Sequence, residues 1–553
     1  MNRRNLTAAV LAGLAGAAGI VGSAQAVNIN PDGLGQVLIY PYYTVNGGNQ
    51  TVLSVVNTTE EGKAVKVRFL EGENSQEVLD FNLYMSQWDV WTAVIYDDAG
   101  TPTMATGDNT CTVPYIYSYN NRPFGAVGGQ QEFLNYELDD GGQTGIERAR
   151  EGHFEMIEMG TLDDFSRGSE FAATHIDGLQ PNTWIQSISQ AFNPPLAPRP
   201  CGQLIDAWTD PDNTVPGDEG YWLMNPLTDL TNPTGGLFGG AAVINVQYGA
   251  MYSYDATAIN GFAATLIDTG FVPLHQQPGF ILPGLNSGDT LTATVFNSDG
   301  STSSATLARG VDAVSYVFMH DQLMNEYTTE MVVGAQTEWI VTFPTKQFYV
   351  FEEQSGSNTG VPPFTSFWDA TLTDFSAEAC EVVQLDTIWD RDERKPGFVP
   401  GQPVPPVVSP APDNPDPDGK PAFELCYETS VIRFGDVDTV GATTEILGSS
   451  NFHNIDNEIL GFEFGWARLQ LADWPEVDAE GEIVPGGQIF TRSLPVVGGV
   501  PLEGLPVAGF AVQRFANNFV GAAAGLIASY GGIYDHKYTR RIGSGCTSGC
   551  QTQ

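Results

Sequence analysis

Short runs of β-branched and aromatic residues follow one another along this chain, separated by clusters of Gly and Asn. Within the run at 63–70, apolar residues alternate with Lys66 and Arg68. This period of two is typical of a strand with one buried face. The first strands are predicted at 36–44, 51–57, 63–70 and 88–96. Their spacing of about a dozen residues favours an antiparallel sandwich of the immunoglobulin-like kind.

Similar runs continue through the rest of the chain. They predict strands at 241–248, 291–297, 313–319, 338–343, 347–351, 423–434 and 460–471. Two short helices are predicted where apolar residues share a helical face, namely Ile185, Ile188 and Phe192, and then Ile259, Phe262, Ala263 and Leu266. The predicted fold class is mainly β, with antiparallel immunoglobulin-like β-sandwich regions, long loops and a few short helices.

A chain of 553 residues is too long for one compact core and predicts two to four domains. We expect a signal peptide at 1–26 and a β-sandwich-like region at 27–110. A mixed, loop-rich region with short helices at 111–275 is expected to wrap around or extend the sandwiches. A second β-rich domain at 276–553 contains a Pro-rich loop at 396–421.

The beginning of the chain predicts export. Arg3 and Arg4 precede an apolar run of 16 residues at 6–21, and Ala24-Gln25-Ala26 suits signal peptidase. We expect the mature chain to begin at Val27. The alternative is a membrane anchor, but the run is shorter than the roughly 20 residues that span a bilayer. The arginine pair also resembles a twin-arginine signal, the alternative to an ordinary secretory route.

The six cysteines predict disulfides, because paired cysteines are the rule in exported chains. Proximity in the sequence suggests three bonds, Cys111 with Cys201, Cys380 with Cys426, and Cys546 with Cys550. Fifteen pairings remain open on sequence alone. The stretch at 396–421 reads as an interdomain linker, but a bond between Cys380 and Cys426 would make it a projecting loop, which we favour.

The charge balance excludes two classes of partner. The chain carries 66 Asp and Glu but only 23 Lys and Arg, for a net charge of −43. Such a surface repels nucleic acid and anionic lipid. No stretch after the signal peptide is long enough for a transmembrane span.

Motifs of enzymatic catalysis are missing from the sequence. It contains no nucleophile elbow, phosphate loop, dinucleotide fingerprint or zinc-protease motif, and its six histidines are scattered singly. Glu155 and Glu158 lie in an apolar setting that raises carboxyl pKa values, but in a strand they would point to opposite faces. We therefore assign no catalytic and no cofactor-binding residues.

The strongest metal-like pattern is calcium-like. Asn414, Asp416 and Asp418 alternate before Gly419, as oxygen ligands do in a calcium loop. Position twelve of that loop would be Leu425, which is not a ligand. The alternative is a solvated, Pro-rich turn, and calcium is the one cofactor that the sequence suggests.

One further pattern concerns aromatic residues near the end of the chain. Leu460, Phe462, Phe464 and Trp466 point one way in a strand. Such a stripe is usually part of a core, and we expect that here. A ligand platform is the alternative.

Three segments carry a resemblance to known proteins: VLIYPYYTVNGGNQTVLSVVNTTEEGKAVKVRF at 37–69, REGHFEMIEMG at 150–160 and TEWIVTFPTKQFYVF at 337–351. They are similar to a group of exported cell-surface proteins of Gram-negative bacteria that have no assigned activity. The resemblance implies a Gram-negative exported setting. It brings no ligand and no site residue.

Together these features predict a non-enzymatic protein of the periplasm, cell surface or exterior with a structural or adhesive role. Its partner would be a cell-envelope protein or a glycan. The first alternative is a carbohydrate-binding or polysaccharide-active protein, which would need exposed aromatic rings along a groove. The second is calcium-dependent surface assembly.

Overall fold

In a computed structural model of the protein, residues 26–543 are described with internal gaps. The residues outside the description are 1–25, 109, 115, 117–128, 164–168, 170–172, 174–200, 211–218, 269, 298, 370–378, 392, 394–421, 437–440, 457–461, 476–486, 518–527 and 544–553. The expected signal peptide, the Pro-rich loop and the helix predicted around Ile185 therefore lie outside the described residues.

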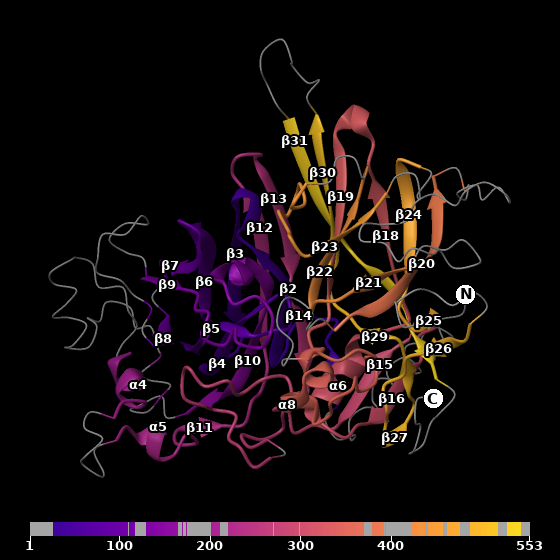
Figure 1. The fold of residues 1–553 in the computed structure, drawn as a ribbon. Coiled ribbons are helices and arrows are strands. Elements are labelled where there is room, and N and C mark those ends of the chain that lie inside the picture. Colours follow the sequence, from indigo (N-terminus) through magenta and orange to yellow (C-terminus); the bar gives the residue numbers. More distant parts are fainter. Residues whose placement is uncertain are drawn as a thin grey trace, which may run out of the picture.

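Two sheets form a first sandwich, drawn in indigo to magenta in Figure 1. Sheet 1 has the order β1-β14-β2-β10-β4-β5-β8, with β11 beside β10, and sheet 2 has the order β13-β12-β3-β6-β7-β9. The strands of sheet 1 are β1 Asn28–Ile29, β2 Val37–Thr44, β4 Lys63–Glu71, β5 Glu77–Met85, β8 Cys111–Val113, β10 Glu151–Leu162, β11 Leu230–Thr231 and β14 Thr257–Asn260. Those of sheet 2 are β3 Asn49–Asn57, β6 Val90–Asp98, β7 Thr101–Thr106, β9 Gly129–Glu132, β12 Leu237–Asn245 and β13 Ala250–Asp255.

Two further sheets form a second sandwich, drawn in salmon to yellow in Figure 1. Sheet 3 has the order β21-β20-β24-β18-β32, and sheet 4 has the order β23-β22-β19-β30-β31. The strands of sheet 3 are β18 Gln322–Thr328, β20 Glu381–Asp390, β21 Ala422–Leu425, β24 Phe464–Gln470 and β32 Lys537–Thr539. Those of sheet 4 are β19 Ala335–Thr342, β22 Thr429–Phe434, β23 Phe452–Ile455, β30 Phe510–Asn517 and β31 Ala528–Asp535.

Shorter elements fill the space below the second sandwich and beside the first. A small sheet of β15, β16 and β27 lies next to helix α6, at the bottom of Figure 1. The bounds are β15 Thr292–Phe296, β16 Thr302–Thr306, β27 Gly498–Gly499, α6 Gly310–Phe318, α7 Gln347–Val350, α8 Glu352–Ser355, α4 Gly202–Asp206 and α5 Tyr221–Met224. The remaining pairs are β17 Met319–His320 with β29 Leu505–Pro506, β25 Asp473–Pro475 with β26 Ile489–Thr491, and β28 Leu502–Glu503 with β33 Arg541–Ile542; the 3-10 turns are η1 Asn46–Gly48, η2 Ile146–Arg150 and η3 Met331–Val333.

The central strands β19, β22 and β30 of sheet 4 are buried on both faces, and they join the two sandwiches. Along β19, Trp339 and Val341 pack into the core shared with sheet 3, whereas Ile340 packs into the core of the first sandwich. The ring of Phe510 stacks on Tyr254 of β13 with centroids 4.7 Å apart. The alternation of strand side chains therefore makes sheet 4 a wall common to both cores.

The predicted fold class is confirmed: the described part of the chain is mainly β, with antiparallel sheets packed as sandwiches, long loops and a few short helices. Cys111 is bonded to Cys201, and Cys380 to Cys426. Cys546 and Cys550 lie outside the described residues. Across the described ranges, no helix combines the length and the apolar character that crossing a bilayer requires.

Three secondary-structure predictions are wrong. The runs at 313–319 and 347–351 are the helices α6 and α7. All nine residues of α6 are buried, so the helix shows no polar face, and its valines imitate a strand. The Asp312 carboxylate accepts the backbone N–H of Arg309 at 3.0 Å, a contact that satisfies an open donor at the helix start.

The helix predicted around Ile259 is instead strand β14 followed by a loop. Ile259 pairs with Val37 in sheet 1. The Gln36 side chain then accepts the N–H of Ala263 at 3.0 Å and donates to its carbonyl at 2.9 Å. Tertiary pairing therefore overrides the helical spacing of these apolar residues.

Candidate functional site

The predicted calcium ligands Asn414, Asp416 and Asp418 lie outside the described residues, so this site stays a prediction. A different group, Cys380, Glu424 and Cys426, brings three possible ligand atoms within 4.8 Å of one another. Its two sulfurs are bonded to each other. Because a metal binds the thiolate form of cysteine, this group is a disulfide beside a carboxylate and not a metal site.

The two carboxylates of the apolar strand β10 are bound to different cations. Arg68 donates to Glu155 at 2.5 Å, and Lys63 donates to Glu158 at 2.9 Å. Glu158 also accepts the backbone N–H groups of Thr234 and Gly235. Each carboxylate is thus neutralised separately, and the pair does not face a common space.

Of the described histidines, His153, His275, His320 and His536 are buried, and His453 is half-buried. Burial lowers the pKa of His153 to about 3, and lowers those of His275, His453 and His536 to about 4. His275 contacts the Tyr84 hydroxyl at 2.9 Å and the Pro226 carbonyl at 2.7 Å. These imidazoles are neutral structural groups.

A cluster of charged side chains joins the two sandwiches where the turn after β4 meets the segment before β22. Arg148 donates to Glu71 at 2.8 Å and to Asp140 at 2.7 Å, and lies 3.2 Å from Glu73. Glu428, from the second sandwich, accepts the Ser75 hydroxyl. We call Glu71, Glu73, Asp140, Arg148 and Glu428 the junction cluster.

Burial changes the protonation of the junction cluster. It raises the pKa of Glu73 to about 8 and that of Glu428 to about 8, and the nearby Glu71 charge adds to both shifts. Burial thus shifts both carboxyl groups towards the protonated form. Because all five side chains of the cluster are buried, we assign it to the joining of the sandwiches.

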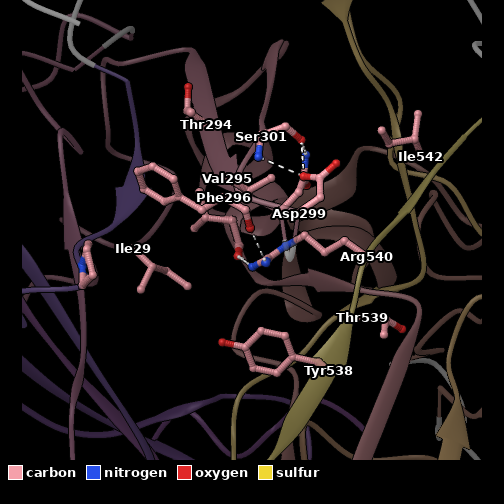
Figure 2. A pocket seen from close by; sticks show the side chains of 13 residues that line it. Ile29, Thr294, Val295, Phe296, Asp299, Ser301, Tyr538, Thr539, Arg540 and Ile542 are labelled. Atoms are coloured by element: carbon pink, nitrogen blue, oxygen red, sulfur yellow. Dashed lines mark hydrogen bonds between the residues drawn. The ribbon is translucent and has the colours of Figure 1, made fainter. Parts of the chain in front are cut away.

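A hollow of about 620 Å³ lies beside β15, the turn that follows it and the chain near Arg540. Figure 2 shows the side chains that line it. The Arg540 guanidinium donates to the carbonyls of Phe296 and Val317, both at 3.2 Å. On another wall, Asp299 accepts the N–H of Ser301 at 2.9 Å and its hydroxyl at 2.6 Å. These side chains brace the β15–β16 turn and the end of α6, which is a structural role.

The aromatic stripe of β24 faces outward, so its predicted place in the core is wrong. Phe464 is half-buried and Trp466 is 36% exposed. The inward face of the strand carries Ala467 and Leu469, both fully buried. Leu460 lies outside the described residues. Small and aliphatic residues fill the core here because the facing strand β22 supplies the bulky ring of Phe434.

Trp466 belongs to a groove of about 490 Å³ between sheet 3 and the edge strand β31 of sheet 4. Strands β18, β24, β31 and β32 line it; β18, β24 and β31 are labelled in the upper half of Figure 1. Asn325 forms part of its lining and donates to the Tyr534 carbonyl at 2.9 Å, which ties the two sheets together. The lining residues are Met324, Asn325, Glu326, Trp466, Ile533, Tyr534, Asp535 and Lys537, and we call this space the Trp466 groove.

The Trp466 groove differs from the junction cluster in the state of its polar groups. The side chains of Glu326, Asp535 and Lys537 are exposed and make no hydrogen bond or ion pair within the described part of the chain. Tyr534 is 42% exposed. The volume lies within the range of small-ligand sites, and the groove offers two aromatic rings and a few open polar groups.

No family model, curated protein or solved structure matches the chain. The Trp466 groove therefore has to be interpreted from its own chemistry. Sequence reasoning named Trp466 but placed it in the core, and it missed Tyr534, Glu326, Asp535 and Lys537. The charged residues of β18 and β31 are the sequence feature that could have indicated the groove. Their two strands become neighbours only in the folded structure.

Proposed function

We propose that this chain is an exported, non-enzymatic protein of the cell envelope or exterior with an adhesive role, and that it adheres through the Trp466 groove. The observation that carries the proposal is the set of open groups there. In the junction cluster, by contrast, the buried carboxylates of Glu71 and Asp140 are bound to Arg148. Glu326, Asp535 and Lys537 are instead free to bind a partner.

The chemistry of the groove favours a glycan as that partner, which is the carbohydrate-binding alternative in its non-catalytic form. The faces of Trp466 and Tyr534 offer apolar platforms with polar edges, which suit the C–H faces of sugar rings. The carboxylates of Glu326 and Asp535 accept hydrogen bonds from hydroxyl groups, and the Lys537 ammonium donates them. A hydroxyl-rich, weakly charged ligand satisfies all of these groups together.

The direct test is binding of the purified mature chain to a glycan array, with Trp466→Ala and Tyr534→Ala as variants. Loss of a central aromatic anchor costs about 2 kcal/mol, or roughly thirtyfold in affinity. Tyr530→Ala is the matched control, because Tyr530 is 62% exposed on the same strand β31 but does not line the groove. Retention of no glycan, or equal retention by the double variant, would refute the proposal.

The polysaccharide-active alternative makes a different prediction at the same groove, where two carboxylates are present. Glycosidases use paired acids, so an enzyme would shorten a retained glycan, and Glu326→Gln or Asp535→Asn would stop that cleavage. Our proposal expects the glycan to be recovered at full length after long incubation, as measured by mass spectrometry. Shortened products would refute a purely adhesive role and support the polysaccharide-active alternative.

The exported setting is tested separately by protease shaving of intact source cells. Recovery of peptides from 396–421 without opening the outer membrane supports an exterior location. Recovery only after the membrane is opened would place the protein in the periplasm and direct the search to a partner there.

Calcium-dependent assembly remains the third hypothesis, because Asn414, Asp416 and Asp418 match a calcium loop in sequence. It predicts a rise in melting temperature with added calcium, and loss of that rise in the Asp416→Asn, Asp418→Asn variant. A melting temperature that does not change when calcium is added would refute this hypothesis.

A further inference from the structure

Lys63, at the start of strand β4, is a buried lysine whose hydrogen bonds are complete. An ammonium group has three N–H donors. The Lys63 side chain is fully buried, and its ammonium donates to Glu158 at 2.9 Å, to the Thr161 hydroxyl at 3.2 Å and to the Thr234 hydroxyl. Each donor has its own acceptor, so Lys63 is held as a charged ammonium paired with Glu158.

Lys66, on the same strand, is equally buried but has fewer partners. Its Nζ atom contacts the Oδ2 atom of Asp80 and donates to the Phe280 carbonyl at 2.8 Å. A third acceptor is missing from the described part of the chain. Two partners match the two N–H groups of a neutral amine, whose lone pair is then left for attack on a carbonyl carbon.

The surroundings of Lys66 favour that neutral form. Its side chain is 0% exposed, and the side chain of Asp80 is 8% exposed. Burial lowers the pKa of Lys66 against the opposing effect of Asp80, as expected for an amine taken out of water. Transfer of one proton from the ammonium to the carboxylate turns two buried charges into a neutral amine and a neutral acid, which are cheaper to bury.

The segment at 273–284 presents two backbone groups to this pair. The Gly279 N–H donates to the same Oδ2 atom of Asp80 at 3.0 Å, and the Phe280 carbonyl accepts from Lys66. A donor at that oxygen stabilises the negative charge that develops there when an amine attacks the carboxyl carbon. An acceptor for one N–H group of the amine fixes the orientation of its nitrogen.

The pairing of β4 with β5 keeps the amine and the carboxyl group in contact. Asp80 pairs with Arg68, which lies two residues from Lys66 and on the same face of β4. Groups held in this way react as if at an effective concentration of about 10⁵ M or more. Such a concentration compensates for the slow reaction of an amine with a carboxylic acid in water.

We propose that Lys66 and Asp80 join in an intramolecular amide bond that links β4 to β5. The Lys66 Nζ atom attacks the Asp80 Cγ atom, an N–C bond forms, and one C–O bond of the carboxyl group breaks. The oxygen leaves as water and takes two hydrogens from the ammonium. Ammonium and carboxylate thus give amide and water, and nothing is oxidised or reduced.

The partners that the product needs are already in place. A secondary amide has one N–H and one C=O, and each has to be satisfied when it is buried. The Phe280 carbonyl accepts the first, and the Gly279 N–H donates to the second. The bond therefore removes two buried charges and leaves the cover over sheet 1 unchanged.

Peptide mapping of the purified chain, denatured and reduced, tests this proposal. Trypsin does not cleave after a lysine whose amine is acylated, so the peptide 64–68 should stay uncut at Lys66 and remain joined to the peptide that begins at Phe69. The joined pair should weigh one water less than the sum of its parts, and fragmentation should place the bond between Lys66 and Asp80. Cleavage at Lys66, with each peptide recovered separately at its full mass, would overturn the proposal.

Variants of the two lysines and of Asp80 supply the controls. Lys66→Arg and Asp80→Ala should each give separate peptides without loss of water, whereas Lys63→Arg should keep the link. A link that persists in Lys66→Arg or in Asp80→Ala would overturn the proposal. The wild-type map decides the question even where a variant does not fold, and it does not depend on glycan binding by the Trp466 groove.

Discussion

The outer faces of the two sheets of the first sandwich differ in polarity and in exposure to water. Sheet 1 carries charged side chains there, yet Lys66 is fully buried and Arg68 is 4% exposed. Sheet 2 carries valines on its outer face, yet Val90 is 49% exposed. Within one sandwich, the polar outer face is therefore dry and the apolar outer face is wet.

The segment at 273–284 causes this difference, because it covers sheet 1. The Phe280 carbonyl accepts the Lys66 ammonium at 2.8 Å, and the Gly279 N–H donates to Asp80 at 3.0 Å. Beneath it, Arg68 is paired with Glu77 and Glu155. Buried charges are tolerated only when they are paired and hydrogen-bonded, so this cover requires the matched ion pairs.

The largest expected effect comes from breaking that match with Arg68→Met. The substitution leaves Glu155 and Glu77 buried without their cation, and such a loss costs about 3–5 kcal/mol. We expect the free energy of unfolding in urea to fall by that amount. Arg150→Met is the control, because its partner Asp97 on β6 of sheet 2 is 40% exposed, and an exposed pair is worth about 1 kcal/mol or less. Equal losses in the two variants would mean that the sheet 1 pair is not dry.

The second prediction concerns the junction cluster, where the turn after β4 is buried against the second sandwich. The folded-state pKa of Glu428, about 8, lies above its ordinary value of 4.5. The stability that its proton supplies is fully present below pH 4.5 and is lost as the pH rises through 8. Glu428→Gln should remove this loss, so its free energy of unfolding relative to wild type should increase by on the order of 2 kcal/mol between pH 6 and pH 8.

Chemical denaturation at the two pH values measures this difference. Glu352→Gln is the control, because Glu352 is an exposed glutamate at the start of α8. If the stability difference between Glu428→Gln and wild type does not change with pH, the junction cluster holds no proton at Glu428.

The third prediction uses His153, which is fully buried on β10 with no hydrogen-bond partner for either ring nitrogen in the described chain. Burial and the Arg68 charge lower its pKa to about 3. A histidine with a depressed folded pKa is most costly in acid, so stability is full above pH 6.5 and is lost as the pH falls towards 3. His153→Leu should therefore gain about 1 kcal/mol relative to wild type between pH 7 and pH 5.5.

The control for this acid effect is His453→Leu. Its pKa is also lowered by burial, to about 4, but His453 lies on β23 in the second sandwich, away from Arg68. Both variants should gain stability in acid. A His153→Leu variant whose gain does not depend on pH would show that His153 is hydrated in the folded protein.

The sequence predicts the inner face of this fold better than the outer faces. Val65, Val67 and Phe69 alternate correctly and are fully buried. The same pattern implies that Lys66 and Arg68 face water. No local feature of the sequence indicates that a segment about 210 residues later covers them. The failure is one of long-range packing and not of strand periodicity.

The Trp466 groove shows the same limit. The spacing of Phe464 and Trp466 predicts a shared face but does not say which face is buried. Strand β31 contributes Tyr534 and Asp535 from some 70 residues further along. A groove between two sheets depends on how the sheets pair, which spacing within a single strand does not determine.

The smallest expected effect is on the exposed outer face of sheet 2. Val90→Asp should change the free energy of unfolding by no more than about 0.5 kcal/mol, because the new carboxylate reaches water. Ile95→Asp, on the same strand but fully buried in the core, should cost more than about 3 kcal/mol, because an unpaired charge would enter the core. Both are measured by urea unfolding.

This small effect separates an exposed face from a core. An apolar side chain that is covered within the chain loses stability when it becomes charged, whereas an exposed one does not. If Val90→Asp lowered the free energy of unfolding by about 2 kcal/mol or more, the outer face of sheet 2 would be covered as that of sheet 1 is, and the difference between the two outer faces would disappear. If its stability is unchanged while Ile95→Asp is strongly destabilised, sheet 2 has its dry face inward alone, whereas sheet 1 is dry on both faces.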